Sequence, residues 1–160
     1  MLFIAGPIQG APDYQTPLAE RVIQKTDKVL VASPRRTVLP EHFDYDEQVD
    51  WEQVHLGRAA TNGVCLFWLE ARDFSLPYEK GRPFAKTTFG EFNYALGRKR
   101  ENPAVNITMG IHPDYSKSGG ISERNIRSMA RRAGLPVYGS IAETEAAALA
   151  DIERIENYLK

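Results

Sequence analysis

The sequence has few groups that crosslink a chain or bind a metal. Cys65 is the only cysteine among 160 residues, so an intrachain disulfide is excluded and the chain fits a reducing compartment. Because Cys65 lies within an apolar run, residues 64–68, we expect a buried packing thiol rather than a reactive one. The three histidines do not cluster with it, and the sequence therefore predicts no metal site.

A strong net charge and a long apolar run are also lacking. The formal net charge is −1, which argues against a nucleic acid polymer as partner because such binding requires a basic face. The apolar run at residues 1–5 is shorter than a signal peptide or a membrane span, and no other segment is long enough. We therefore expect a cytoplasmic protein without a membrane partner, for which a small nucleotide remains a compatible ligand.

Short apolar runs alternate with segments of helical periodicity, without internal repeats. The predicted strands are residues 2–5, 29–32, 64–69, 104–111 and 136–138. The predicted helices are residues 15–29, 49–61, 88–98, 121–133 and 141–159. This alternation predicts an α/β fold in a single domain, residues 1–160, with helices on both faces of a parallel sheet. Right-handed crossovers favour a five-stranded flavodoxin-like (Rossmann-like) sheet.

Ligands of such sheets bind outside the carboxyl ends of the strands. The segments predicted at that edge are residues 6–14, 33–46, 70–88 and 112–122. The stretch 70–86 is long and rich in proline and glycine, which is typical of a functional loop, and we expect it to cover a ligand.

Glu91 follows this long loop and is predicted in the first turn of a helix. The helix dipole would keep a carboxylate there ionised, and an ionised carboxylate can attack an electrophilic carbon. The spacing Thr88-x-x-Glu91 also fits a capping box, in which the glutamate folds back on the backbone. Ser140-x-x-Glu143 has the same spacing without any sign of catalysis, so spacing alone leaves both interpretations open.

The helix start resembles that of the nucleoside 2-deoxyribosyltransferases, Thr-x-x-Glu-x-x-x-Ala, whose glutamate is the nucleophile. Thr88, Glu91 and Ala95 match this pattern, whereas Asn93 stands where the family often has glycine. The opening Phe-Ile-Ala-Gly-Pro-Ile, residues 3–8, is similar to the first strand and turn of the family. Residues 35–40, 45–52 and 60–69 resemble one of its branches. The resemblance covers residues 1–100 and becomes vague after Ile111.

The resemblance implies several substrate-binding positions. Gly6, Pro7 and Gln9 would line the sugar pocket, and Thr88 would lie beside the substrate. His55 stands where relatives commonly have an aspartate that binds the sugar or assists the base.

Four further residues are candidates at the rim. Arg35 and Arg36 form either a solvated pair or a phosphate-binding fork, and His112 is a possible ligand contact. Relatives complete the pocket with a polar residue of a neighbouring subunit, for which Asn125 is the candidate. The expected assembly is a homodimer or a larger homo-oligomer.

The activity implied is transfer of a 2-deoxyribosyl group between bases through a covalent glycosyl-Glu91 intermediate. The partners would be a nucleoside or nucleotide and a free nucleobase. No cofactor is expected because the chemistry is substitution. His55, Glu70 or Asp73 are candidates to assist the departing base. Two alternatives stay open: an N-glycosidase that uses water as acceptor, and a nucleotide-binding module without turnover.

Overall fold

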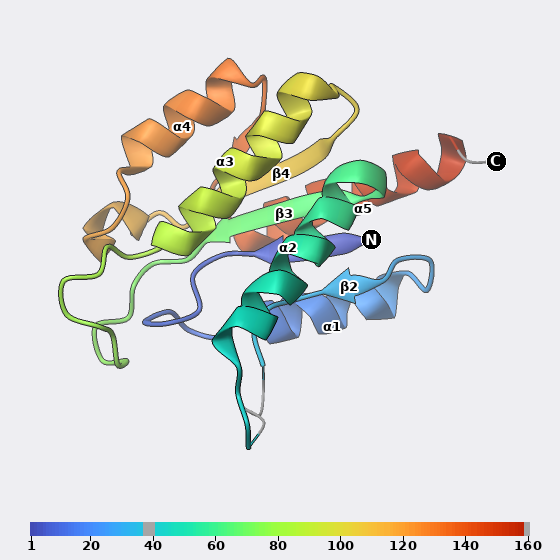
Figure 1. Ribbon diagram of the computed structural model, residues 1–160. Coiled ribbons are helices and arrows are strands. Elements are labelled where there is room, and N and C mark those ends of the chain that lie inside the picture. The colour runs from blue at the N-terminus through green and yellow to red at the C-terminus, as the bar shows by residue number, and fades with distance from the viewer. Residues whose placement is uncertain (37–40, 159–160) are drawn as a thin grey trace.

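The chain forms one parallel β-sheet covered by helices on both faces (Figure 1). The computed structural model describes residues 1–36 and 41–158. The strands are β1 (Leu2–Ala5), β2 (Val31–Ala32), β3 (Val64–Leu69), β4 (Asn106–Ile111) and β5 (Val137–Tyr138). Their order in the sheet is β2-β1-β3-β4-β5, and every neighbouring pair is parallel. The flavodoxin-like α/β fold predicted from the sequence is therefore confirmed.

In the described residues, four helices and one short 3-10 turn connect these strands, and a fifth helix follows β5. They are α1 (Gln15–Lys25), α2 (Tyr45–Asn62), α3 (Lys86–Glu101), η1 (Tyr115–Ser118), α4 (Glu123–Arg132) and α5 (Ile141–Tyr158). Side chains of α2, α3 and α4 share one hydrophobic cluster with one face of the sheet. Those of α1 and α5 share the other cluster with the opposite face. None of the helices in the described ranges is long and apolar enough to cross a membrane.

The apolar runs of β1 and β3 supply both clusters by strand alternation. Phe3, Cys65 and Phe67 pack toward α2 and α3, whereas Ile4 and Leu66 pack toward α1 and α5. Burial raises the pKa of the Cys65 thiol to about 12, which keeps it protonated. The interpretation of Cys65 as a packing residue is confirmed.

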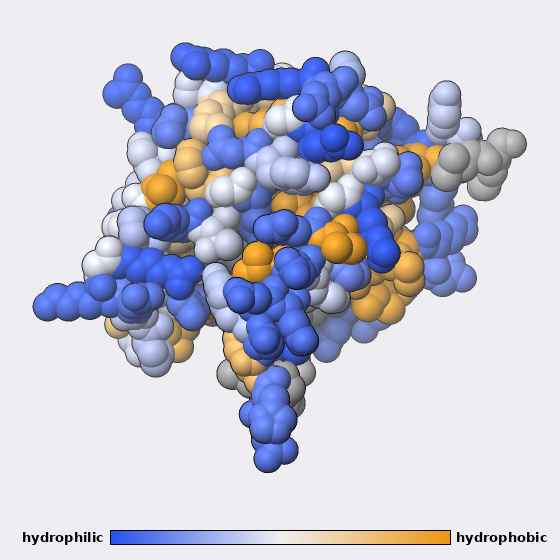
Figure 2. All heavy atoms as spheres, in the orientation of Figure 1, coloured by the Kyte–Doolittle hydropathy of each residue, from blue (hydrophilic) through white to orange (hydrophobic). Residues whose placement is uncertain are grey.

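The apolar face of α5 covers the sheet. Ala148 and Ile152 pack beside β3, and the buried carboxylate of Glu145 accepts hydrogen bonds from Arg21 (2.8 Å) and Lys25 (2.6 Å) of α1. These contacts fix α1 and α5 on the same face of the sheet. Figure 2 shows the opposite face, over α2, α3 and α4, as mostly hydrophilic with small separate hydrophobic spots.

The predicted boundaries are wrong at several ends of helices. The helix predicted at 49–61 begins at Tyr45, because Asp44 caps it by accepting from the backbone N–H groups of Asp46 and Glu47. The first helix ends at Lys25 rather than at residue 29, and only Val31–Ala32 pair as a strand. Residues 37–40, which belong to the segment predicted as an ordered loop, and residue 159 lie outside the described residues.

Candidate active site

The carboxyl end of β1 places a buried tyrosine hydroxyl beside Gly6. Gly6 has a φ of +155°, and a Cβ there would collide with the Tyr14 hydroxyl and with the backbone oxygen of Trp68 at the end of β3. The Tyr14 hydroxyl is buried and has no hydrogen-bond partner among the described residues. Burial raises the pKa of Tyr14 well above its ordinary value of 10.0, so this hydroxyl stays a neutral donor.

Glu91 lies in the second turn of α3, which corrects the prediction of a first-turn position. The helix begins at Lys86, and the residue before it, Ala85, is left-handed (φ 59°) and makes no side-chain cap. Thr88 is therefore a buried residue inside the helix, and the predicted capping box does not form. The Glu91 carboxylate has no hydrogen-bond partner within residues 1–36 and 41–158.

The expectation that the helix dipole keeps Glu91 ionised is also wrong. Burial of its carboxyl group, and secondarily the nearby Glu52 carboxylate, raise the pKa of Glu91 to about 8. The favourable effect of a helix N-terminus fades within the first turn and does not offset this burial. At neutral pH the resting protein therefore holds Glu91 mainly as the carboxylic acid.

Glu52 of α2 is the second carboxyl group of this cluster. Its Oε1 accepts from Gln48 Nε2 (2.7 Å), and Gln48 Oε1 in turn accepts from Arg36 Nε (2.7 Å). Burial raises the pKa of Glu52, while the Gln48 hydrogen bond and the Arg36 charge oppose the rise. We call Gly6, Tyr14, Glu52 and Glu91 the Glu91 cluster. The sequence showed Glu52 only as an acidic residue near a helix start, and it gave no signal for Tyr14.

His55 lies one turn after Glu52 on α2. Its ring stacks on Trp51 with 4.1 Å between centroids, and its Nδ1 is 2.7 Å from the Trp51 backbone oxygen. Because a carbonyl oxygen only accepts, Nδ1 carries a proton. No hydrogen bond joins His55 to Glu91 in the part of the chain that the structure describes.

Arg35 holds the turn that follows β1. Its Nη2 donates to the backbone oxygens of Ile8 (3.1 Å) and Ala11 (3.3 Å), and its Nε donates to Gln15 Oε1 (3.1 Å). Nε also lies 3.2 Å from the carboxylate of Asp13. Two nitrogens of the guanidinium therefore donate to groups of the protein itself. Through these hydrogen bonds Arg35 positions the segment that contains Gly6 and the buried Pro7.

The loop 70–86 is ordered and lies against the same turn. The backbone N–H of Asp73 donates to the oxygen of Gly10 (2.8 Å), and Arg82 bridges Gln9 Oε1 (3.2 Å) and Thr87 Oγ1 (3.1 Å). Arg72 lies over the rings of Phe74 and Tyr78, at 4.7 and 4.5 Å. Gln9 itself is exposed, and its side-chain oxygen already accepts a hydrogen bond from Arg82. The predicted cover therefore contacts the β1 turn directly.

Glu70 and His112 end the neighbouring strands β3 and β4. Glu70 accepts from Trp68 Nε1 (2.9 Å) and from the backbone N–H of Ala71 (2.9 Å). His112 Nδ1 accepts from the N–H of Asp114 (3.0 Å), which leaves the proton on Nε2, 3.7 Å from Glu70. Through these contacts Glu70 holds the segments that follow β3 and β4 in place.

Two hollows in the surface are lined by residues that hydrogen-bond to the β1 turn or to Glu52. One, of about 540 Å³, is lined by Arg35, Arg36 and Gln48 among others, and the second, of about 670 Å³, by Arg82 and Thr87 among others. Glu91 lines neither of them.

Among the predicted site residues, Gly6 lies against Tyr14, whose pKa the charge of Glu91 also raises, and Pro7 and Thr88 lie on the same two segments as Gly6 and Glu91. Asn125 is exposed on α4 and has no side-chain hydrogen bond to the cluster among the described residues. No known family model matches the chain, and no curated protein shows significant similarity to it.

Proposed function

We propose that the chain cleaves the N-glycosidic bond of a nucleoside or nucleotide and transfers the 2-deoxyribosyl group to another base, with Glu91 as the nucleophile. The observation that carries this proposal is a half-buried pair of carboxyl groups, Glu91 and Glu52, which lie on two helices and whose charges interact, with Glu91 also near Tyr14 at the carboxyl end of β1. Parallel sheets bind ligands at that edge, and a carboxyl pair serves glycosidic chemistry. The resemblance to nucleoside 2-deoxyribosyltransferases selects the substrate class.

The raised pKa of Glu91 adds a proton transfer to this mechanism. Burial and the nearby Glu52 carboxylate raise the pKa of Glu91, so Glu91 carries a proton at neutral pH in the resting protein. Glu91 attacks as the carboxylate, after it has lost this proton to solvent, and the positive charge that develops on the sugar stabilises the carboxylate. The bond from the anomeric carbon to the base breaks as the bond to a Glu91 oxygen forms, and the base leaves with the electron pair and takes up a proton. A second base then displaces Glu91.

Mass spectrometry after incubation with nucleosides, nucleotides and a free base tests the reaction class. Base exchange supports transfer, whereas release of free sugar indicates the N-glycosidase, and binding without turnover indicates a non-catalytic module. A substrate with fluorine at the sugar 2-position should trap a covalent adduct on the peptide that contains Glu91, because the electron-poor sugar slows release of the ester.

The pH dependence of kcat/KM separates a nucleophile from a general acid. If the Glu91 carboxylate attacks, kcat/KM should rise with pH and level off above an apparent pKa of about 8. A rate that falls above pH 8 would make the protonated Glu91 the reactive form and would reject the nucleophile.

The proposed homodimer rests on the resemblance alone, in which Asn125 would enter a neighbouring pocket. We expect light scattering at micromolar concentration to show at least twice the chain mass of 18.0 kDa. A single species of chain mass would contradict this prediction.

A further inference from the structure

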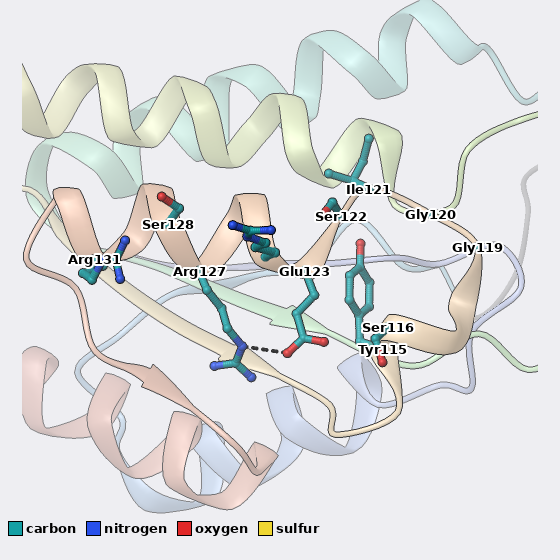
Figure 3. Close-up of a pocket in the computed structure, with 11 residues that line it drawn as sticks. Tyr115, Ser116, Gly119, Gly120, Ile121, Ser122, Glu123, Arg127, Ser128 and Arg131 are labelled. Carbon is teal, nitrogen blue, oxygen red and sulfur yellow. Dashed lines mark hydrogen bonds and ion pairs between the residues drawn. The ribbon is translucent and has the colours of Figure 1, made fainter.

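A third hollow, with a different chemistry, lies on α4 and the loop that precedes it (Figure 3). It measures about 820 Å³ and is bordered by Tyr115 of η1, by the loop 119–122, and by one face of α4. It shares no residue with the Glu91 cluster. Any ligand bound there would be additional to the proposed substrate.

Three arginines of α4 line this hollow, which we call the arginine hollow. Arg124, Arg127 and Arg131 lie on successive turns of one helix, so their Cα atoms span about 10 Å along its axis. The single carboxylate of the lining, Glu123, is paired with Arg127 at 2.6 Å. Arg124 and Arg131 have no ion-pair partner among the described residues. The hollow is therefore locally positive on a chain whose formal net charge is −1.

Hydroxyl groups without a hydrogen-bond partner among the described residues lie at the edge of the same hollow. Tyr115 is only 2% exposed, and its hydroxyl has no hydrogen-bond partner among the described residues. Figure 3 shows this hydroxyl pointing toward the N-terminus of α4, where Ser122 lies. Ser122 is the N-cap residue of α4, yet its side chain makes no capping hydrogen bond. A buried donor without a partner is costly, and an oxygen-rich ligand would satisfy it.

We propose that the arginine hollow binds the phosphate groups of a small phosphorylated ligand. Guanidinium forks bind phosphate oxygens bidentately, and serine and tyrosine hydroxyls add single donors. Because the arginines extend over about 10 Å, the hollow fits a chain of two or three phosphates better than a single phosphate. The N-terminus of α4 adds uncapped N–H groups at one end of the row.

Isothermal titration calorimetry at low salt with orthophosphate, tripolyphosphate and adenosine triphosphate tests this proposal without any turnover. Tripolyphosphate should bind more tightly than orthophosphate, and added salt should weaken it. Equal affinity for tripolyphosphate and adenosine triphosphate would identify a phosphate-chain site, and tighter binding of the nucleotide would identify a nucleotide site. Absence of tripolyphosphate binding would overturn the proposal, as would binding of a short RNA alone.

Variants then locate the site. The double variant R124Q/R131Q should weaken tripolyphosphate binding by about tenfold or more, since two charge-assisted contacts are lost. Arg132→Gln is the matched control: Arg132 is exposed on the same helix but does not line the hollow, so its loss should change affinity less than about twofold.

Two further variants distinguish a built site from general attraction to positive charge. Glu123→Gln removes the opposing carboxylate and frees Arg127, so binding should tighten. Tyr115→Phe keeps the charge but removes the hydroxyl, and we expect affinity to fall severalfold. Equal weakening by R132Q and R124Q/R131Q, or no effect of Tyr115→Phe, would mean that the hollow is an ordinary solvated helix face and would reject the proposal.

Discussion

Two segments of this chain share one sequence pattern and adopt different structures. In Ser140-x-x-Glu143, the serine Oγ accepts from the Glu143 N–H (3.2 Å), and the Glu143 carboxylate accepts from the Ser140 N–H (3.1 Å) and hydroxyl (2.8 Å). This is a reciprocal capping box at the start of α5. In Thr88-x-x-Glu91 the threonine is buried inside α3, and the carboxyl group of Glu91 lies near enough to Glu52 for the Glu52 charge to raise its pKa.

The difference arises from the residues in front of each pattern. Before α3, Phe84 is buried and its backbone oxygen accepts from Ile121 N–H (3.3 Å), so a contact with a distant segment fixes where the chain enters the helix. Ala85 then makes the turn in a left-handed conformation, and α3 begins ahead of its local capping signal. Before α5, the distant contact is the pairing of Tyr138 with Gly110 of β4, and the chain that follows it begins the helix at the local capping signal of Ser140. A glutamate released from capping is free for another role.

The largest effect that would test this contrast is on turnover. Glu91→Gln should lower turnover by about three orders of magnitude or more, because an amide cannot form the glycosyl ester. Glu143→Gln is the matched control: glutamine is accepted in a capping box, so turnover should stay within about twofold of the wild type. Both variants are assayed with the nucleoside and base for which exchange is found. A Glu91→Gln variant that retains a tenth of the wild-type turnover would contradict the proposal that Glu91 is the nucleophile.

The fold could be predicted from the sequence because the same signal, an apolar run followed by a segment of helical periodicity, recurs along the chain. Each apolar run that alternates with a helical segment, such as 64–69, adds independent support for a parallel sheet. The same alternation located the rim, and therefore the neighbourhood of Gly6 and Glu91.

The ionisation of Glu91 could not be predicted in this way. It depends on Glu52, 39 positions earlier in the chain, and on the burial of both carboxyl groups when α2 and α3 pack together. The Tyr14 hydroxyl likewise becomes part of the cluster only because Gly6 lacks a side chain. Such contacts are properties of the packed molecule and leave no periodic signal.

A smaller effect concerns stability. The pKa of Glu91 is raised from its ordinary value of 4.5 to about 8 in the folded protein, so the fold favours the protonated group. Wild-type stability relative to Glu91→Gln should therefore be highest below pH 4.5, fall as the pH rises to about 8, and level off above it. The difference between the two pKa values corresponds to at most about 5 kcal/mol.

Urea unfolding of both proteins at pH 5, 7 and 9 measures this dependence. Glu143→Gln, whose glutamate is on the surface, controls for the exchange of a carboxylate for an amide and should follow the wild type. A difference between wild type and Glu91→Gln that does not change with pH would mean that the Glu91 carboxyl group is solvated, as Glu143 is. The contrast between the two segments would then be one of position alone.

The smallest effect separates the two hydroxyl residues. Ser140→Ala should lower the free energy of unfolding by about 1 kcal/mol, the usual contribution of an N-cap, because the Glu143 N–H loses its acceptor. Thr88→Val should stay within about 0.5 kcal/mol of the wild type, because the Thr88 hydroxyl caps no helix and has no hydrogen bond to a described residue. Urea unfolding at pH 7 gives both values. If Thr88→Val cost as much as Ser140→Ala, Thr88 would be a capping residue, α3 would begin where its sequence pattern predicts, and Glu91 would return to its first turn.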